Sequence, residues 1–204
     1  TILLNGINIS SPQTGHNAAD FPVDMGDIER IEILEGSSAR VFGSSAFNGA
    51  INIVTKREKR TGARLSAEGG SFGTWGVNGR VSVATGAVTN SISGGYRQSD
   101  GGTLHSDFKR RQMFYQGDLA SQHIDLQWQV GLSSQDFGAN TFYSAKFDDQ
   151  FEATRRYLTS LSGTIKPFDT DWLTLVPQLY WHRDYDHYQL IRGKEGAAAG
   201  ENYH

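Results

Sequence analysis

Beyond residue 60, apolar and polar residues alternate along the chain, which is typical of β-strands that have two unlike faces. In the segment 123–134 every second residue is apolar, namely Ile124, Leu126, Trp128, Val130 and Leu132. The same alternation predicts seven strands, over residues 63–72, 75–85, 88–97, 112–120, 123–134, 156–168 and 171–184. This part of the chain is therefore expected to be mainly β.

The first part of the chain has a different pattern. Short apolar runs at residues 2–4, 28–34 and 50–54 are separated by Gly, Ser and Asn, as in a small mixed α/β domain. A charged stretch, residues 56–60, follows the last run. We therefore expect two domains, 1–57 and 58–204.

Two features favour a transmembrane barrel over a soluble β-sandwich, which also alternates. Charged residues occupy the polar face in the middle of several strands, which suits a water-filled lumen. They include Glu68, Arg80, Asp118 and Asp125. The expected links also alternate in length: those near residues 86, 121–122 and 169–170 are tight, and those at 99–111 and 137–155 are long. Short turns at one end and long loops at the other are typical of outer-membrane barrels.

Composition excludes several classes of function. The sequence has 24 Gly but only 4 Pro, it has no Cys, and its net charge is −3. The absence of Cys excludes disulfides, thiol catalysis and Cys-ligated zinc. Lys and Arg are scattered, so no basic face indicates a nucleic-acid partner. No catalytic motif is present, and we predict that the protein is not an enzyme.

One long motif resembles a known family. Residues 28–56 read IERIEILEGSSARVFGSSAFNGAINIVTK. This closely resembles the C-terminal half of the plug domain of TonB-dependent outer-membrane receptors, whose pattern is E-R-I-E-V-x-x-G-P, a turn of small residues, then G-x-I-N-I-x-T. Residues 3–9 resemble the plug strand that precedes it. The departures are Ser37, where the family usually has Pro, and Asn5, where an acid is common.

The resemblance implies the architecture and the cellular role. The chain would hold the C-terminal part of an α/β plug and about 7 antiparallel strands of an incomplete barrel of about 22. It would lie in the outer membrane of a Gram-negative bacterium, with lipid against Leu126, Trp128 and Val130 and the lumen against Gln127 and Gln129. TonB would be its partner in the periplasm, through a segment outside this chain. We expect the chain to be an internal piece of a longer protein.

The resemblance also implies contacts between charged groups of the plug and of the barrel. The candidates on the plug are Arg30, Glu32, Glu35 and Arg40. In a soluble domain the same four residues would form a solvated face, and that alternative stays open.

Within the family, the arrangement is most similar to the cobalamin receptors, which makes cobalamin the first expectation for the cargo. The corresponding plug loop would place six polar residues against the ligand: Ser11, Gln13, Thr14, His16, Asn17 and Asp20. The alternatives are a solvent-exposed loop without a ligand, a ferric siderophore or haem as cargo, and a surface-binding β protein that transports nothing.

The long loop near residues 136–154 is a second candidate site. Its aromatic residues Phe142, Tyr143 and Phe147 are suited to stacking on a flat ligand. The resemblance to cobalamin receptors makes Asp136, Asp148 and Asp149 candidate calcium ligands. Solvated carboxylates are the alternative. We predict no other cofactor.

Overall fold

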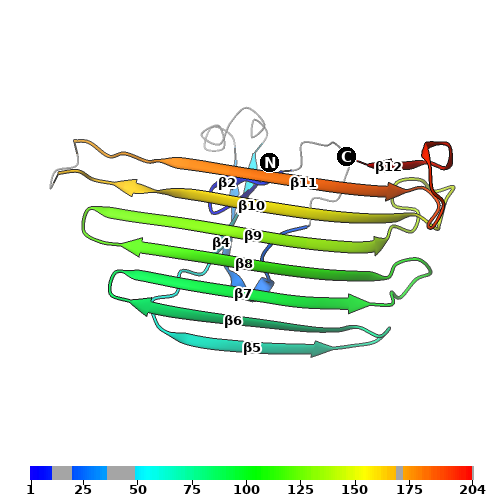
Figure 1. The fold of residues 1–204 in the computed structure, drawn as a ribbon, viewed down its shortest axis with the longest axis horizontal. Helices are drawn as coiled ribbons and strands as arrows, with labels where there is room; N and C mark the ends of the chain where they lie inside the picture. Colours follow the sequence, from blue (N-terminus) through cyan, green and yellow to red (C-terminus); the bar gives the residue numbers. More distant parts are fainter. Residues whose placement is uncertain (11–19, 36–48, 169–171, 204) are drawn as a thin grey trace.

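The computed structural model describes residues 1–10, 20–35, 49–168 and 172–203 and contains two β-sheets. The large sheet has eight antiparallel strands in the order β12-β11-β10-β9-β8-β7-β6-β5 (Figure 1). Its strands are β5 (Gly62–Gly69), β6 (Trp75–Thr85), β7 (Val88–Ser99), β8 (Phe108–Ala120), β9 (Ile124–Gly138), β10 (Phe151–Ile165), β11 (Gln178–Gln189) and β12 (Glu201–Tyr203). The mainly β class with antiparallel strands is thus confirmed.

The small sheet contains four strands in the order β2-β1-β4-β3. They are β1 (Ile2–Leu4), β2 (Ile7–Asn8), β3 (Ile28–Leu34) and β4 (Ala50–Thr55). Strand β1 pairs in parallel with β4, and β3 pairs with β4 in antiparallel fashion. A short 3₁₀ helix, η1 (Met25–Asp27), precedes β3, and another, η4 (Ala197–Ala199), precedes β12.

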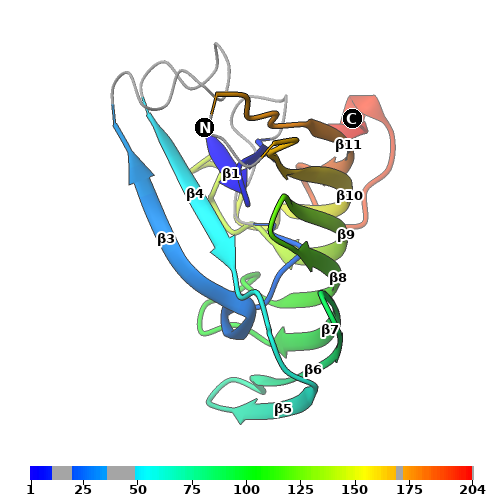
Figure 2. The same ribbon diagram turned by 90° about the vertical axis from the view of Figure 1, so that its left-hand side faces the viewer.

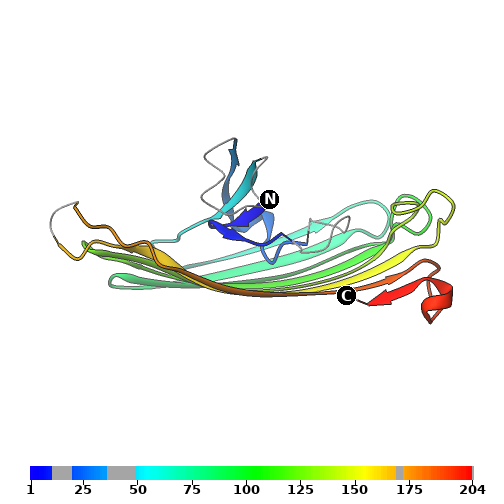
Figure 3. The same cartoon turned by 90° about the horizontal axis from the view of Figure 1, so that it is seen from above.

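The small sheet sits on the concave face of the large one. The large sheet is curved along its strands, and the small sheet rises from the inner side of the curve (Figure 3). Strand β3 lies on the side of the small sheet that faces away from the large sheet (Figure 2). No helix within the described ranges is long and apolar enough to cross a bilayer.

The observed strands differ from the predicted ones mainly at their ends. Strands β8 and β10 begin at Phe108 and Phe151, earlier than predicted, because ladder hydrogen bonds continue where the apolar alternation has stopped. The predicted strand 171–184 is instead β11, from Gln178 to Gln189. Only an isolated bridge, Ile165 to Leu175, precedes it, because Pro177 has no N–H to donate. The link between β10 and β11 is consequently not tight, contrary to expectation.

The alternation assigns the two faces of the large sheet as predicted. Gln116, Gln129 and Ser160 lie opposite one another on three neighbouring strands, and all three are buried beneath the small sheet. The next residues along these strands, such as Val130 after Gln129 and Leu161 after Ser160, point to the outer face and are more than one-third exposed. The polar face therefore points inward, towards the small sheet.

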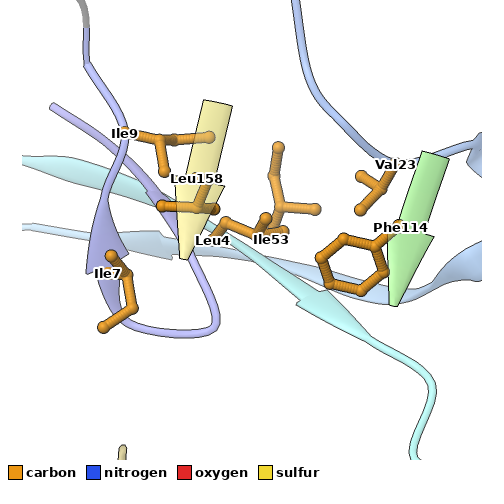
Figure 4. Close-up of a cluster of buried hydrophobic side chains, with 7 residues drawn as sticks. All are labelled: Leu4, Ile7, Ile9, Val23, Ile53, Phe114 and Leu158. Carbon is orange, nitrogen blue, oxygen red and sulfur yellow. The ribbon is translucent and has the colours of Figure 1, made fainter. Parts of the chain in front are cut away.

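A compact apolar cluster joins the sheets at one place. It contains Leu4, Ile7, Ile9, Val23 and Ile53 from the small sheet and its flanks, with Phe114 and Leu158 from the large sheet (Figure 4). Close approach is possible here because residue 131 is Gly: a Cβ atom at this position would lie 2.8 Å from Pro22. Only two side chains from the described strands of the large sheet, which we call the wall, join this cluster.

The register can be tested with nitroxide spin labels on the full-length protein in lipid. We expect labels at Val130 and Leu161 to be accessible to oxygen dissolved in the bilayer, and labels at Gln129 and Ser160 to be shielded, because side chains alternate across the sheet. The reverse pattern would place the register wrong by one residue.

Candidate functional site

A row of buried amide and hydroxyl groups joins the two sheets. The Asn5 amide donates to Gln129 Oε1 at 2.9 Å and to Thr55 Oγ1 at 2.8 Å, and Thr55 Oγ1 donates to Gln116 Oε1 at 2.5 Å. The Asn5 side chain can reach the wall because Asn5 and Gly6 form a turn with positive φ angles, 51° and 79°. We call these four side chains the amide seam.

A fully buried carboxylate makes the second connection. Asp27 ends helix η1 and has 0 % relative exposure. Its Oδ1 accepts from Arg80 Nη1 at 3.1 Å and from Arg64 Nη2 at 3.2 Å, and its Oδ2 accepts from Ser93 Oγ at 2.5 Å. Because a buried charge is costly unless it is paired and hydrogen-bonded, this set fixes the small sheet at one position on β5–β7.

The link between the two sheets is also attached to the wall. Arg57, just after β4, donates to Asp118 Oδ1 and Asp125 Oδ1, each at 2.8 Å. Partial burial disfavours its charge, but the hydrogen bond that Arg57 donates to Asp125 and the negative charges of Asp118 and Asp125 outweigh this effect, so the pKa of Arg57 is raised. Arg57 therefore remains charged and holds the link in place.

Near the other end of the interface, the wall contacts the segment 20–24. Thr154 Oγ1 donates to Asp20 Oδ2 at 2.8 Å, and Arg156 Nη1 donates to the Asp20 carbonyl at 2.9 Å. Arg110 donates to the carbonyl of Phe21 at 2.6 Å. Asp20, a predicted ligand contact, is thus buried against the wall. The other five predicted residues of that loop, Ser11, Gln13, Thr14, His16 and Asn17, lie outside the described residues.

A groove of about 360 Å³ runs between this segment and strands β5–β8. Its lining includes Asp24, Glu68, Arg97, Arg110 and Gln112. Arg97 and Glu68 form an ion pair at 2.6 Å on its wall. With both signs of charge and an amide present, the groove offers hydrogen bonds to a polar ligand and is not a purely apolar pocket.

The three long links, which lie at the same end of the strands of the large sheet, contact one another. Arg192 donates twice to the Asp107 carboxylate, at 2.7 and 2.8 Å, and its guanidinium lies 4.8 Å from the Phe151 ring centroid. His105 Nδ1 lies 2.9 Å from the Asp148 carbonyl oxygen. The links 100–107, 139–150 and 190–200 thus form one connected cluster. The hydrogen bond from Arg192 is the main reason why the pKa of Asp107 is lowered.

The three predicted aromatic ligand contacts differ in exposure. Phe142 is 66 % exposed. Tyr143 is half-buried, donates to the Glu152 carboxylate, and packs edge-on against Phe142 and Tyr188 with centroids 4.8 and 5.2 Å apart. Phe147 is half-buried, and its carbonyl accepts from Gln150. Phe142 therefore offers the most accessible ring of the three.

The three candidate calcium ligands do not converge. Asp136 lies on β9 and pairs with Arg155 at 2.8 Å, whereas Asp148 and Asp149 belong to the following link. Among the described residues, no group of three or more His, Cys, Asp and Glu side chains is arranged to hold a metal. Asp136 lies at an outward strand position and pairs with an arginine, so the three candidate calcium ligands are not brought together in the described residues.

Of the predicted charged contacts of the plug, Arg30, Glu32 and Glu35 lie away from the described wall. Arg30 pairs with Glu29 at 3.2 Å and with Glu32 at 2.8 Å, all on β3, and Glu35 is exposed. Arg40 lies outside the described residues. The charged contacts found with the described wall involve Asp27 and Arg57, which the sequence reasoning missed. The available signal was Arg80, a charge in the middle of a strand.

The pKa of Asp107 predicts how acid affects the connected links. A lowered pKa means that the Arg192 pair stabilises the links above the ordinary value of 3.8 and loses this effect as the pH falls through the lowered folded value. A spin label at Ala198 should therefore gain mobility only below a pH of about 4. In Asp107→Asn it should be mobile at neutral pH as well. Asp100→Asn, an exposed carboxylate of the same link, is the matched control. Unchanged label mobility in Asp107→Asn at neutral pH would show that the Asp107–Arg192 pair does not hold the links together.

Comparison with known proteins places this geometry in a family. The family model described as "TonB-dependent Receptor Plug Domain" matches residues 1–50. The chain is 37 % identical over 87 residues to the vitamin B12 transporter BtuB of Photobacterium profundum, covering 42 % of this chain and 14 % of that protein. It is 31 % identical over 166 residues to the rhizobactin receptor of Rhizobium meliloti, covering 73 % and 21 %.

Solved structures show the same fold. The siderophore receptor PiuA of Acinetobacter baumannii superposes with a TM-score of 0.67 at 13 % identity, covering 92 % of this chain and 29 % of that one. The pyoverdine receptor FpvA of Pseudomonas aeruginosa gives a TM-score of 0.66 at 14 % identity, with coverages of 92 % and 30 %. The chain spans less than a third of the length of these relatives. Motif, fold and relatives agree that this chain belongs to the TonB-dependent receptors of the Gram-negative outer membrane.

Proposed function

We propose that the receptor containing this chain takes up a scarce nutrient across the outer membrane with energy supplied through TonB, and that cobalamin is its cargo. The observation that carries the proposal is the docking of the small sheet on the concave, polar face of the strand wall. A plug held in this way closes the lumen. The matched relatives named as vitamin B12 transporters support cobalamin in particular.

The contacts between plug and wall suit this role. The amide seam and the Asp27 set consist of hydrogen bonds whose groups can exchange partners with water, whereas the apolar cluster has only two side chains from the described wall. The neutral bonds of the amide seam lose little when water replaces the partner, because the net worth of one such bond is about 1 kcal/mol. A plug of this kind is held in one position at rest and can be displaced by a pulling force.

The predicted ligand contacts become part of this proposal. Ser11, Gln13, Thr14, His16, Asn17 and Asp20 would form the plug side of the site, and Phe142, Tyr143 and Phe147 the loop side. Arg30, Glu32, Glu35 and Arg40 would meet the part of the barrel that this chain does not contain. We place the boundary between plug and wall at residues 57 and 58, between the last strand of the small sheet and the first of the large one.

A ferric siderophore is the second candidate. The rhizobactin receptor matches nearly three-quarters of the chain, and the groove beside Arg97 and Arg110 carries guanidinium groups that suit an anionic chelate. Three relatives of similar sequence are named as vitamin B12 transporters, which is why cobalamin is placed first.

Calorimetry on the complete receptor in detergent tests the cargo. We expect heat of binding with cyanocobalamin and a loss of affinity of about tenfold in Phe142→Ala, because an exposed aromatic ring at the mouth offers stacking area. Phe168→Ala, an exposed ring in the link at the opposite end of the sheet, is the matched control and should bind normally. Absence of heat with cyanocobalamin, together with binding of a ferric siderophore or haem, would overturn cobalamin.

A further inference from the structure

Two glycines hollow the wall beneath the groove that borders the segment 20–24. Gly76 on β6 and Gly95 on β7 occupy inward positions, so neither strand presents a side chain to the groove there. A Cβ atom at residue 95 would lie 2.6 Å from Gln112 Nε2 and 2.9 Å from Asn78 Nδ2. The amides of Asn78 and Gln112, from the strands on either side of β7, therefore lean over Gly95 and bring their N–H donors close together.

Two buried donors in this groove lack an acceptor among the described residues. Asn78 is 7 % exposed, and its Nδ2 makes no hydrogen bond within the described ranges. Arg110 uses Nη2 for the Phe21 carbonyl at 2.6 Å, while its buried Nε has no partner in the same ranges. Gln112 Nε2 makes a long contact, 3.5 Å, with Asp24 Oδ2. Because a buried N–H without an acceptor is costly, these groups are placed to donate to an oxygen of a ligand.

The charges that border the groove are already compensated. Arg97 pairs with Glu68 at 2.6 Å. The charge of Arg110 is attracted by the carboxylates of Asp20 and Asp24. An anionic ligand would have to compete with these carboxylates for the two guanidinium groups. A neutral group that both accepts and donates hydrogen bonds therefore suits the groove better than an anion does.

The groove reaches the end of the wall at which the long links lie. Glu68 and Gly76 form a pair on β5 and β6, next to the short link 70–74. Residue 75 pairs with residue 98, just before the long link 100–107, so the two links lie at the same end. A ligand held among the links could therefore extend a side arm into the groove.

We propose that this groove is a subsite for a primary carboxamide on the edge of the cargo. The carboxamide oxygen would accept from Asn78 Nδ2 and Arg110 Nε, and its NH₂ group would donate to Asp24 or Glu68. The inference rests on the proposed function, because cobalamin carries such carboxamides around its ring. With a volume of about 360 Å³, the groove would take a side arm of the ligand and leave the ring outside.

Calorimetry with cyanocobalamin and its monocarboxylic acids, in which one carboxamide is hydrolysed to a carboxylate, tests this subsite on the complete receptor. We expect Asn78→Ala to weaken the binding of cyanocobalamin about tenfold, through the loss of a buried hydrogen bond. At least one monocarboxylic isomer should bind the parent receptor about tenfold more weakly, because its new charge lies beside Asp24 and Glu68. Glu68→Gln should restore most of the affinity for that isomer and leave cyanocobalamin unaffected, since Gln still accepts a hydrogen bond.

Gln98→Ala is the matched control, since Gln98 is an amide on the outer face of β7 at the same end of the wall. It should bind cyanocobalamin as the parent does. Thermal unfolding without ligand should be unchanged in Asn78→Ala, because the amide that is removed has no partner among the described residues.

The subsite and the cargo fail in different ways. Unchanged affinity for cyanocobalamin in Asn78→Ala, equal affinity of the parent for all isomers, or a loss of binding that merely follows a destabilised fold would overturn the subsite and leave cobalamin as the cargo. Absence of cyanocobalamin binding by the parent receptor would overturn the cargo, and the subsite with it.

Discussion

The buried carboxylate of Asp27 determines how the two sheets of this protein fit together. A charge with no exposed surface is stable only where donors are already in position, and here they come from two arginines and a serine on three neighbouring wall strands. If the small sheet moved along the wall by one residue, the carboxylate would face outward-pointing positions with no donors. The position of the plug is therefore specified by charge and hydrogen bonding more than by apolar packing.

This mode of attachment connects structure to the proposed transport. An interface with a large apolar core would resist displacement until that core was fully exposed to water. The interface here has the amide seam, the Asp27 set and Arg57, with only Phe114 and Leu158 as apolar contributions from the described wall. Directional bonds give a precise resting position, and each can be exchanged for water in turn. Under the proposed function, such a plug would close the lumen at rest and open under force.

The sequence predicted what depends on local periodicity and failed where contacts cross long distances. Alternation identified the wall strands and their inward face, and the motif at residues 28–56 identified the family. Nothing in the local sequence linked Asp27 to Arg80 on the wall, because its partners Arg64, Arg80 and Ser93 are 37, 53 and 66 residues away. Asp136 was expected in a loop with two other carboxylates, but the ladder of β9 extends past it. The polar ends of strands lack apolar alternation, so the sequence assigned them to loops and placed candidate metal ligands there.

The central claim is that the Asp27–Arg80 pair fixes the plug on the wall, and a double-mutant cycle tests it most directly. Asp27→Asn, Arg80→Gln and the double variant of the complete receptor would be compared in urea, with plug release followed by a spin label at the exposed Ile33. The predicted result is a coupling free energy of about 2–3 kcal/mol, because each single change leaves a buried charge without its partner. Additive effects, with a coupling near zero, would contradict the account.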